Sequence, residues 1–182
     1  SLGLVGSEMC IRDRLKTDRL WLRDSGPIFL VNNKNRKKTM LDFKFNAWSK
    51  YKNFRNDNKI NSLISKYLNI KSILPKKVNS KKFVRVVMEG GAFDNNGSGS
   101  ILLTKECLLS RKQERNKGFK KIDYENLFSK YLNAKNFIWL NKGIVGDDTH
   151  GHIDDIARFV SKSTIMIAVE NNRSDKNYKA LK

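Results

Sequence analysis

The residues best suited to chemistry lie together in one stretch of the printed sequence. Residues 146–159 read GDDTHGHIDDIARF and contain both histidines of the protein, His150 and His152, with four of its eighteen acidic residues. The unperturbed pKa of histidine lies nearest neutral pH, so a histidine among carboxylates can act as an acid, a base or a metal ligand. A solvated acidic loop is the alternative explanation of this stretch.

Two other acidic residues keep a fixed spacing to this stretch. Asp24, Glu89 and Asp154 are separated by 65 residues each. Each lies between an apolar segment and a strand-like run that follows it, and we therefore interpret the three acids as equivalent positions in a repeat. The preceding segments are 20–22, 83–88 and 137–144, and the following runs are 28–31, 100–104 and 156–160.

A second repeated string marks the helices of this repeat. Residues 65–71 read SKYLNIK and residues 129–135 read SKYLNAK, 64 residues apart. Each string closes a segment whose apolar residues recur at helical spacing, and strand-like stretches follow at 70–74 and 136–140. The predicted unit is strand, acid-bearing loop, strand, further strand and helix, present about two and a half times. This pattern predicts an α/β fold.

A repeat around a pseudo-symmetry axis would bring the equivalent loops together. Asp24, Glu89, His152 and Asp154 would then meet in one pocket. Such a set suits a planar cation such as a guanidinium, because carboxylates bind it through paired hydrogen bonds. His152 and Asp154 are two positions apart, so on a strand their side chains would share one face. Trp21 could line this pocket or stack on the cation.

A metal site is a second interpretation of the same stretch. The string HGHIDD at residues 150–155 is close to the HxHxDH pattern of the metallo-β-lactamase superfamily. It has Asp155 where that pattern has a histidine, and no histidine follows it. Two histidines with acids could still bind one zinc or iron ion. We expect no metal and no other cofactor, and a metal-dependent hydrolase stays open as an alternative.

The composition limits the partners and the compartment. The formal net charge is +19, but the 26 lysines and 11 arginines are dispersed in short runs, which are typical of solvated surfaces. A non-catalytic, basic nucleic-acid-binding module is therefore an alternative and not the main interpretation. The two cysteines, Cys10 and Cys107, exclude a disulfide framework and favour the cytoplasm. No apolar run is long enough to span a membrane.

The first residues do not follow the pattern of the rest. Residues 1–14 read SLGLVGSEMCIRDR and lack the long apolar stretch of a signal peptide. We expect them to be a non-native leader. We expect residues 15–182 to form one partial domain of about two and a half modules.

Six strings of this chain resemble, in their order, the agmatine deiminase and bacterial peptidylarginine deiminase family. The fold that this resemblance implies is a pseudo-symmetric α/β propeller of five ββαβ modules, the pentein fold, of which this chain would hold about half. The sequence departs from the family at Ser49 (usually glycine), Ser100 (usually threonine) and Lys117 (usually proline). The six strings are residues 21–27 (WLRDSGP), 45–48 (FNAW), 89–91 (EGG), 96–99 (NGSG), 103–109 (LTKECLL) and 146–160.

The resemblance also implies roles for individual residues. In the family a cysteine thiolate attacks the guanidinium carbon, ammonia leaves, and water hydrolyses the covalent intermediate. His152 matches the general acid and base, and Glu89 matches the residue that orients and charges it. Asp24 and Asp154 match the carboxylates that bind the guanidinium, and Trp21 matches a residue that lines the pocket. The implied substrate is the small molecule agmatine, converted to N-carbamoylputrescine and ammonia without a cofactor.

The family nucleophile belongs to a glycine-rich string that ends in His-Cys. This sequence has no such string, and Cys107 matches the LTKECLL segment instead. We therefore expect residues 15–182 to be a partial deiminase domain that is inactive alone. The enzyme would be cytoplasmic and serve polyamine and putrescine biosynthesis, and its full-length form could be a homodimer. Peptidylarginine deiminase is a related alternative, because the far end of the substrate would decide between the two.

Overall fold

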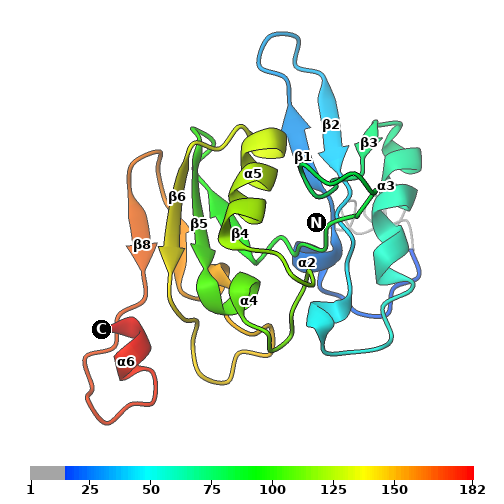
Figure 1. The fold of residues 1–182 in the computed structure, drawn as a ribbon. Coiled ribbons are helices and arrows are strands. Elements are labelled where there is room, and N and C mark those ends of the chain that lie inside the picture. Colours follow the sequence, from blue (N-terminus) through cyan, green and yellow to red (C-terminus); the bar gives the residue numbers. More distant parts are fainter. Residues whose placement is uncertain (1–14) are drawn as a thin grey trace, which may run out of the picture.

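The computed structural model describes residues 15–182, so the leader expected at 1–14 lies outside the described residues. Figure 1 shows small sheets arranged side by side, with helices packed against two of them. In this described part of the chain no helix is both long and apolar enough to cross a membrane.

The first module pairs two sequential strands and closes with a crossover. β1 (Ile28–Val31) runs antiparallel to β2 (Lys38–Leu41), and β2 runs parallel to β3 (Ser72–Ile73). Parallel neighbours cannot be joined by a tight hairpin, so the chain must cross over between β2 and β3. That crossover contains the 3-10 helices η1 (Ala47–Ser49) and η2 (Asp57–Lys59) and the helix α3 (Ile60–Leu68).

The second module repeats this topology. β4 (Phe93–Asn95) runs antiparallel to β5 (Ser100–Thr104), and β5 runs parallel to β6 (Asn136–Leu140). The crossover between β5 and β6 contains α4 (Lys105–Leu109) and α5 (Lys121–Leu132), which lie on one face of the sheet (Figure 1). The predicted α/β character and the ββαβ order of each module are therefore confirmed.

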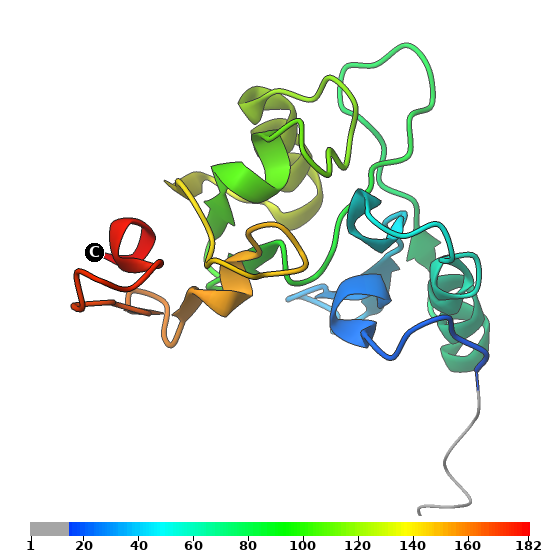
Figure 2. The same ribbon diagram turned by 90° about the horizontal axis from the view of Figure 1, so that it is seen from below.

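A third, shorter unit follows. β7 (Ala157–Phe159) pairs antiparallel with β8 (Ile165–Ile167), and the described chain ends with the helix α6 (Tyr178–Leu181). Two short helices precede strands at equivalent places: α2 (Leu22–Ser25) lies before β1, and η3 (Ile153–Asp155) lies before β7. Figure 2 shows both short helices on the same side of the molecule.

The SKYLN strings end the two crossover helices in the same way. Asn69 and Asn133 follow the last helical residues in the left-handed conformation, with φ of 51° and 53°. Asparagine is one of the few residues other than glycine that adopts this conformation readily. The hydroxyls of Ser65 and Ser129 each donate to the carbonyl five residues ahead, at 2.7 and 2.9 Å. The sequence echo is therefore a structural repeat.

One core joins the first two modules. Buried apolar side chains of both sheets pack with the apolar face of α5, where Leu127 and Phe128 are fully buried. Phe43 and Met88 belong to the same cluster although they lie in connecting segments. Burial of each such side chain contributes about 1.5–3 kcal/mol, so this core fixes the connecting segments that carry the acids.

Three predicted elements differ from the structure. Residues 83–88 form isolated bridges, Arg85 to Lys76 and Val87 to Lys44, and not a strand. Residues 20–22 are exposed and lead into α2. His152 and Asp154 do not share a strand, because η3 begins between them. The apolar pattern of residues 83–88 marked a partly buried connecting segment, and that of residues 20–22 marked exposed residues at the start of a helix.

Candidate active site

The structure brings the four predicted polar residues together around one imidazole. His152 is 2% exposed, and two carboxylates lie near one nitrogen of its ring and a third near the other. Nδ1 of His152 is 3.7 Å from Oδ1 of Asp24 and 3.8 Å from Oδ1 of Asp154, and Nε2 is 3.8 Å from Oε2 of Glu89. The spacing of 65 residues therefore marks positions that converge in space. The catalytic and binding roles of these residues stay predictions.

Asp24 is held by two fixed donors. Its Oδ2 accepts a hydrogen bond from the indole Nε1 of Trp48 at 3.0 Å, and its Oδ1 accepts one from the backbone N–H of Gly91 at 3.0 Å. Burial raises the pKa of Asp24, the nearby Glu89 raises it further, and His152 opposes the change, so the net shift is upward. The carboxylate is thus oriented before any ligand arrives.

The indole donor stands on an unusual turn. Ala47, Trp48 and Ser49 all have left-handed backbone conformations, with φ of 50°, 58° and 53°. Such a conformation costs about 1–2 kcal/mol per non-glycine residue. The Asn46 side chain accepts from the backbone N–H of Ser49 at 3.0 Å, and the Ser49 hydroxyl donates to the carbonyl of Glu114 at 2.8 Å. Strain of this kind concentrates at functional sites, and here it aims Trp48 at the site.

This turn also shows why glycine is usual at position 49 in the family that the sequence resembles. Ser49 occupies a position with φ of 53°, where glycine carries no steric penalty. Trp48 itself was missing from the predicted site residues. The FNAW string that contains it was a signal for it, but the contact with Asp24 is tertiary and could not be read from spacing.

The EGG string allows close approach at the centre of the site. A Cβ atom at Gly91 would lie 2.5 Å from Nδ1 of His152 and 2.8 Å from both Oδ1 of Asp24 and Oδ2 of Asp154. A Cβ atom at Gly90 would collide with the backbone carbonyl of Arg23. The absence of a side chain at Gly91 therefore lets the His152 ring and two carboxylates pack against the backbone there, and its absence at Gly90 lets the α2 backbone do the same.

Glu89 is fully buried and paired with a fully buried arginine. Its Oε1 accepts from Nε of Arg115 at 3.0 Å, and neither side chain is exposed to solvent. Burial alone would raise the pKa of Glu89, but Arg115 and then His152 outweigh it, and the net shift is downward. Arg115 was also absent from the predicted site residues, although it lies two residues before Lys117, where the family usually has proline.

An Asp-centred turn positions His152. Oδ2 of Asp147 accepts from the backbone N–H groups of Gly151, at 2.6 Å, and of His152, at 3.1 Å, while Oδ1 accepts from that of Thr149 at 2.7 Å. Burial would raise the pKa of Asp147, but the Thr149 hydroxyl, which donates to Oδ1 at 2.6 Å, and then these backbone donors hold it below its usual range. His150 points elsewhere, with its Nε2 3.1 Å from the hydroxyl of Ser110.

The two histidines have opposite environments, which predicts opposite titrations. Burial would lower the pKa of His152, but Glu89 and then Asp24 outweigh it and the net shift is upward. For His150, burial is the largest cause and lowers the pKa. In a ¹³C-NMR titration of the 182-residue chain, we expect the two imidazoles to titrate on opposite sides of the ordinary value of 6.5.

The same shift predicts how stability changes with pH. A folded-state pKa above 6.5 means that protonation of His152 stabilises the fold fully below pH 6.5, and that this contribution is lost as the pH rises through the folded-state pKa. In urea unfolding, the free energy of unfolding of the unmodified chain should fall as the pH rises through this range, and this fall should be absent in His152→Gln. A His152 resonance that titrates below that of His150 would contradict the carboxylate environment.

Asp154 and Trp21 lie at the exposed edge. Oδ2 of Asp154 accepts from Nε of Arg23 at 3.3 Å, so this carboxylate already pairs with a guanidinium group. Trp21 is 63% exposed, and its backbone carbonyl accepts from Asp24 and Ser25 at the start of α2. No hydrogen bond or ring contact of the Trp21 indole is present among residues 15–182. Its role in lining the pocket stays a prediction.

The geometry bears on the metal interpretation as well. In the described part of the chain, donor atoms of Glu89, Cys107 and His152 lie within 4.8 Å of one another. The Arg115 guanidinium already neutralises Glu89 and would oppose a cation there. Burial raises the pKa of the Cys107 thiol, which lies in the core and not at the exposed edge of the site. His150 is not part of this group, so the two-histidine arrangement of the HGHIDD interpretation does not form.

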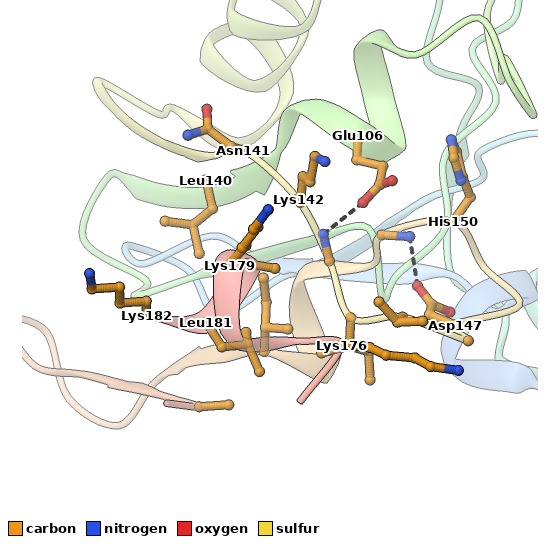
Figure 3. Close-up of a pocket in the computed structure, with 18 of the residues that line it drawn as sticks. Glu106, Leu140, Asn141, Lys142, Asp147, His150, Lys176, Lys179, Leu181 and Lys182 are labelled. Carbon is orange, nitrogen blue, oxygen red and sulfur yellow. Dashed lines mark hydrogen bonds between the residues drawn. The ribbon is translucent and has the colours of Figure 1, made fainter. Parts of the chain in front are cut away.

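A separate cavity of about 800 Å³ adjoins the His150 loop (Figure 3). Glu106 contributes to its wall and accepts from the backbone N–H of Gly143 at 2.9 Å. None of the five predicted site residues lines it. Its charged lining has more cations than anions and does not suit a cationic substrate. The charged residues are Lys112, Lys142, Lys176, Lys179, Lys182, Glu106 and Asp147.

Comparison with known proteins identifies relatives over almost the whole chain. A candidate agmatine deiminase of Legionella pneumophila strain Philadelphia 1 is 36% identical over 162 residues, which are 88% of this chain and 43% of that protein. A candidate agmatine deiminase of Latilactobacillus sakei strain 23K is 35% identical over 166 residues, 87% of this chain and 42% of that protein. The chain thus spans less than half the length of these relatives.

Solved structures agree with this result. The agmatine deiminase of Enterococcus faecalis matches with a TM-score of 0.79 and 29% identity, covering 92% of this chain and 44% of that one. A cysteine-to-serine variant of C. jejuni agmatine deiminase with substrate bound matches with a TM-score of 0.79 and 32% identity, covering 93% and 47%. The fold of the chain is therefore the pentein fold of these enzymes, here as two ββαβ modules and the start of a third.

A family-level match covers the same region. The family described as Porphyromonas-type peptidyl-arginine deiminase matches residues 7–182. This range includes every segment that meets at His152. By sequence and by fold, the chain belongs to the Porphyromonas-type peptidyl-arginine deiminase family.

Proposed function

We propose that the chain forms the guanidinium-binding and proton-transfer part of an amidine hydrolase that converts agmatine to N-carbamoylputrescine and ammonia. The observation that carries this proposal is the convergence of Asp24, Glu89 and Asp154 on His152, each within 3.8 Å of its ring. When all are ionised, these carboxylates exceed the two buried cations, Arg115 and protonated His152, by one negative charge, and in the absence of ligand the Arg23 guanidinium on Asp154 offsets it. A monocationic guanidinium is complementary to that excess.

The surroundings of the two ring nitrogens of His152 support a different proposed task for each. Nε2 of His152 faces Glu89, whose charge favours the imidazolium. Nδ1 faces Asp24 and Asp154, the two carboxylates proposed to bind the guanidinium. Nδ1 is therefore the atom placed to give a proton to the departing amine and then to take one from the water that hydrolyses the covalent intermediate. The net reaction consumes one water and releases one ammonia.

The nucleophile of this reaction is not Cys107. The thiol is fully buried in the core, and burial raises its pKa, whereas nucleophilic attack requires a thiolate. The substrate complex of the C. jejuni relative was obtained with a cysteine-to-serine variant, which supports a cysteine nucleophile in the family. The 182-residue chain should therefore bind substrate without turning it over.

Calorimetry with matched ligands tests this function. We expect the chain to bind agmatine and to bind putrescine, which lacks the guanidinium, at least about 10-fold more weakly, since one charge-assisted hydrogen bond contributes about 1.5–3 kcal/mol. Asp24→Asn should weaken agmatine binding by a similar factor, while Cys107→Ser should leave it unchanged. Equal affinity for the two ligands would overturn the guanidinium assignment.

The wider setting of this enzyme follows from its substrate. We infer a cytoplasmic enzyme of polyamine and putrescine biosynthesis, with a homodimer as the proposed full-length form. The ligand series should include N-acetyl-arginine amide, because the family also contains peptidylarginine deiminases. Stronger binding of that peptide analogue than of agmatine would favour the peptidylarginine alternative.

A further inference from the structure

Arg115 is the buried cation behind the site. Its side chain is fully shielded from solvent, and its guanidinium makes three directed contacts. Nε donates to Oε1 of Glu89 at 3.0 Å, Nη1 donates to the carbonyl of Gln113 at 2.9 Å, and Nη2 donates to the carbonyl of Thr149. A planar guanidinium fork can satisfy three such acceptors in fixed directions, whereas a lysine ammonium cannot reproduce that geometry.

These contacts join segments that are distant in the sequence. Thr149 lies three residues before His152 in the same loop. Glu89 lies in a different segment, and its carboxylate faces Nε2 of the imidazole. Gln113 extends the connection, because its amide donates to the carbonyls of Trp48 at 3.1 Å and Asp148 at 3.2 Å. One cation thus ties the loops that carry Glu89, His152 and Trp48.

We propose that Arg115 is a positioning residue, which fixes the Glu89 carboxylate against His152 and divides the charge of that carboxylate between itself and the imidazole. Oε1 of Glu89 bonds to Arg115, while Oε2 faces Nε2 of His152 at 3.8 Å and has no hydrogen-bond partner among the described residues. Glu89 therefore stands between two cationic groups. Arg115 prevents it from turning fully toward His152.

The charges around His152 determine the sign of the effect. Among the described residues, the ionisable groups that act on the imidazole are Asp24, Glu89, Asp154, Asp155, Arg115 and Cys107. The carboxylates favour the imidazolium and Arg115 opposes it. Removal of the Arg115 charge makes the cluster more negative, so His152 should hold its proton to higher pH. The catalytic consequence rests on the proposed function, but the titration does not.

NMR titration of His152 in Arg115→Gln tests the proposal. We expect the His152 resonance to titrate at higher pH than in the unmodified chain. Arg85→Gln is the matched control, since Arg85 also pairs with a buried carboxylate, Asp42, at 2.6 Å but does not contact the site. That variant should lose stability without moving the His152 titration. An unchanged or lowered His152 titration in Arg115→Gln would overturn the positioning role.

Two further variants cover the case in which Arg115→Gln does not fold. Arg115→Lys keeps the charge and loses the fork, so its His152 titration should stay near that of the unmodified chain while the urea midpoint falls. The double change Glu89→Gln with Arg115→Gln leaves no unpaired buried charge. Because Glu89 acts on His152 more strongly than Arg115 does, its His152 should titrate at lower pH than normal. A His152 titration displaced from that of the unmodified chain in Arg115→Lys, or raised above it in the double variant, would refute the proposal.

Agmatine calorimetry on the same variants distinguishes a failure of the proposed function from a failure of the positioning role of Arg115. If the unmodified chain binds no agmatine while Arg115→Gln still raises the His152 titration, the positioning role stands and the proposed function fails. If the chain binds agmatine but the titration does not respond to Arg115, the function stands and the positioning role fails.

Discussion

Replacement of Gly91 by alanine is expected to abolish guanidinium binding while the chain stays folded. The added Cβ would lie 2.5 Å from Nδ1 of His152 and 2.8 Å from oxygens of Asp24 and Asp154. Carbon atoms in packed interiors stay about 3.5 Å from their neighbours, so all three groups must move apart. Asp24 and Asp154 could then no longer hydrogen-bond the guanidinium together. Since each charge-assisted hydrogen bond contributes about 1.5–3 kcal/mol, the affinity for agmatine should fall at least about 100-fold.

The fold should tolerate this change. Gly91 is not among the residues with left-handed backbone, so alanine can adopt its conformation. Gly97→Ala is the matched control: position 97 has φ of 66° and open space around it, so alanine there should cost about 1 kcal/mol of stability and leave agmatine binding intact. Undiminished binding by Gly91→Ala in calorimetry would show that the ligand binds elsewhere.

Glu89→Ala should destabilise the chain more than other carboxylate substitutions. The change leaves the Arg115 guanidinium buried without its counter-ion, and breaking a buried pair in this way costs about 3–5 kcal/mol. That is a large part of the roughly 5–15 kcal/mol that typically stabilises a domain. Urea unfolding at pH 7 measures the difference in the free energy of unfolding.

The pH dependence of this loss gives a second check. Since the pKa of Glu89 in the folded chain is lowered, its contribution is present above its ordinary value of 4.5 and is lost as the pH falls through the folded-state pKa. The difference between the unmodified chain and Glu89→Ala should therefore shrink in acid. Asp148→Ala, which removes an exposed ion pair with Lys50, should change stability little at either pH. A Glu89→Ala loss as small as that of Asp148→Ala would contradict the buried-pair argument.

Much of the secondary structure follows from local pattern. The strands at residues 28–31, 100–104 and 136–140 have the predicted bounds, because apolar runs bounded by turns specify strands locally. Residues 83–88 were mispredicted as a strand, since Val86 and Met88 belong to the shared core while the backbone of the segment pairs only through single bridges. Burial and strand pairing are separate properties, and hydrophobicity reports only the first.

The sequence by itself determined which acids are equivalent. The repeat spacing of Asp24, Glu89 and Asp154 was enough to place all three around His152, because a repeated module puts equivalent loops at the same end. The tertiary structure alone decided what supports them. Trp48, Gly91 and Arg115 act through contacts between segments 24 to 67 residues apart in sequence, and no local pattern encodes such contacts. A carboxylate indicates its chemistry by its type, whereas a positioning residue is defined only by what it touches.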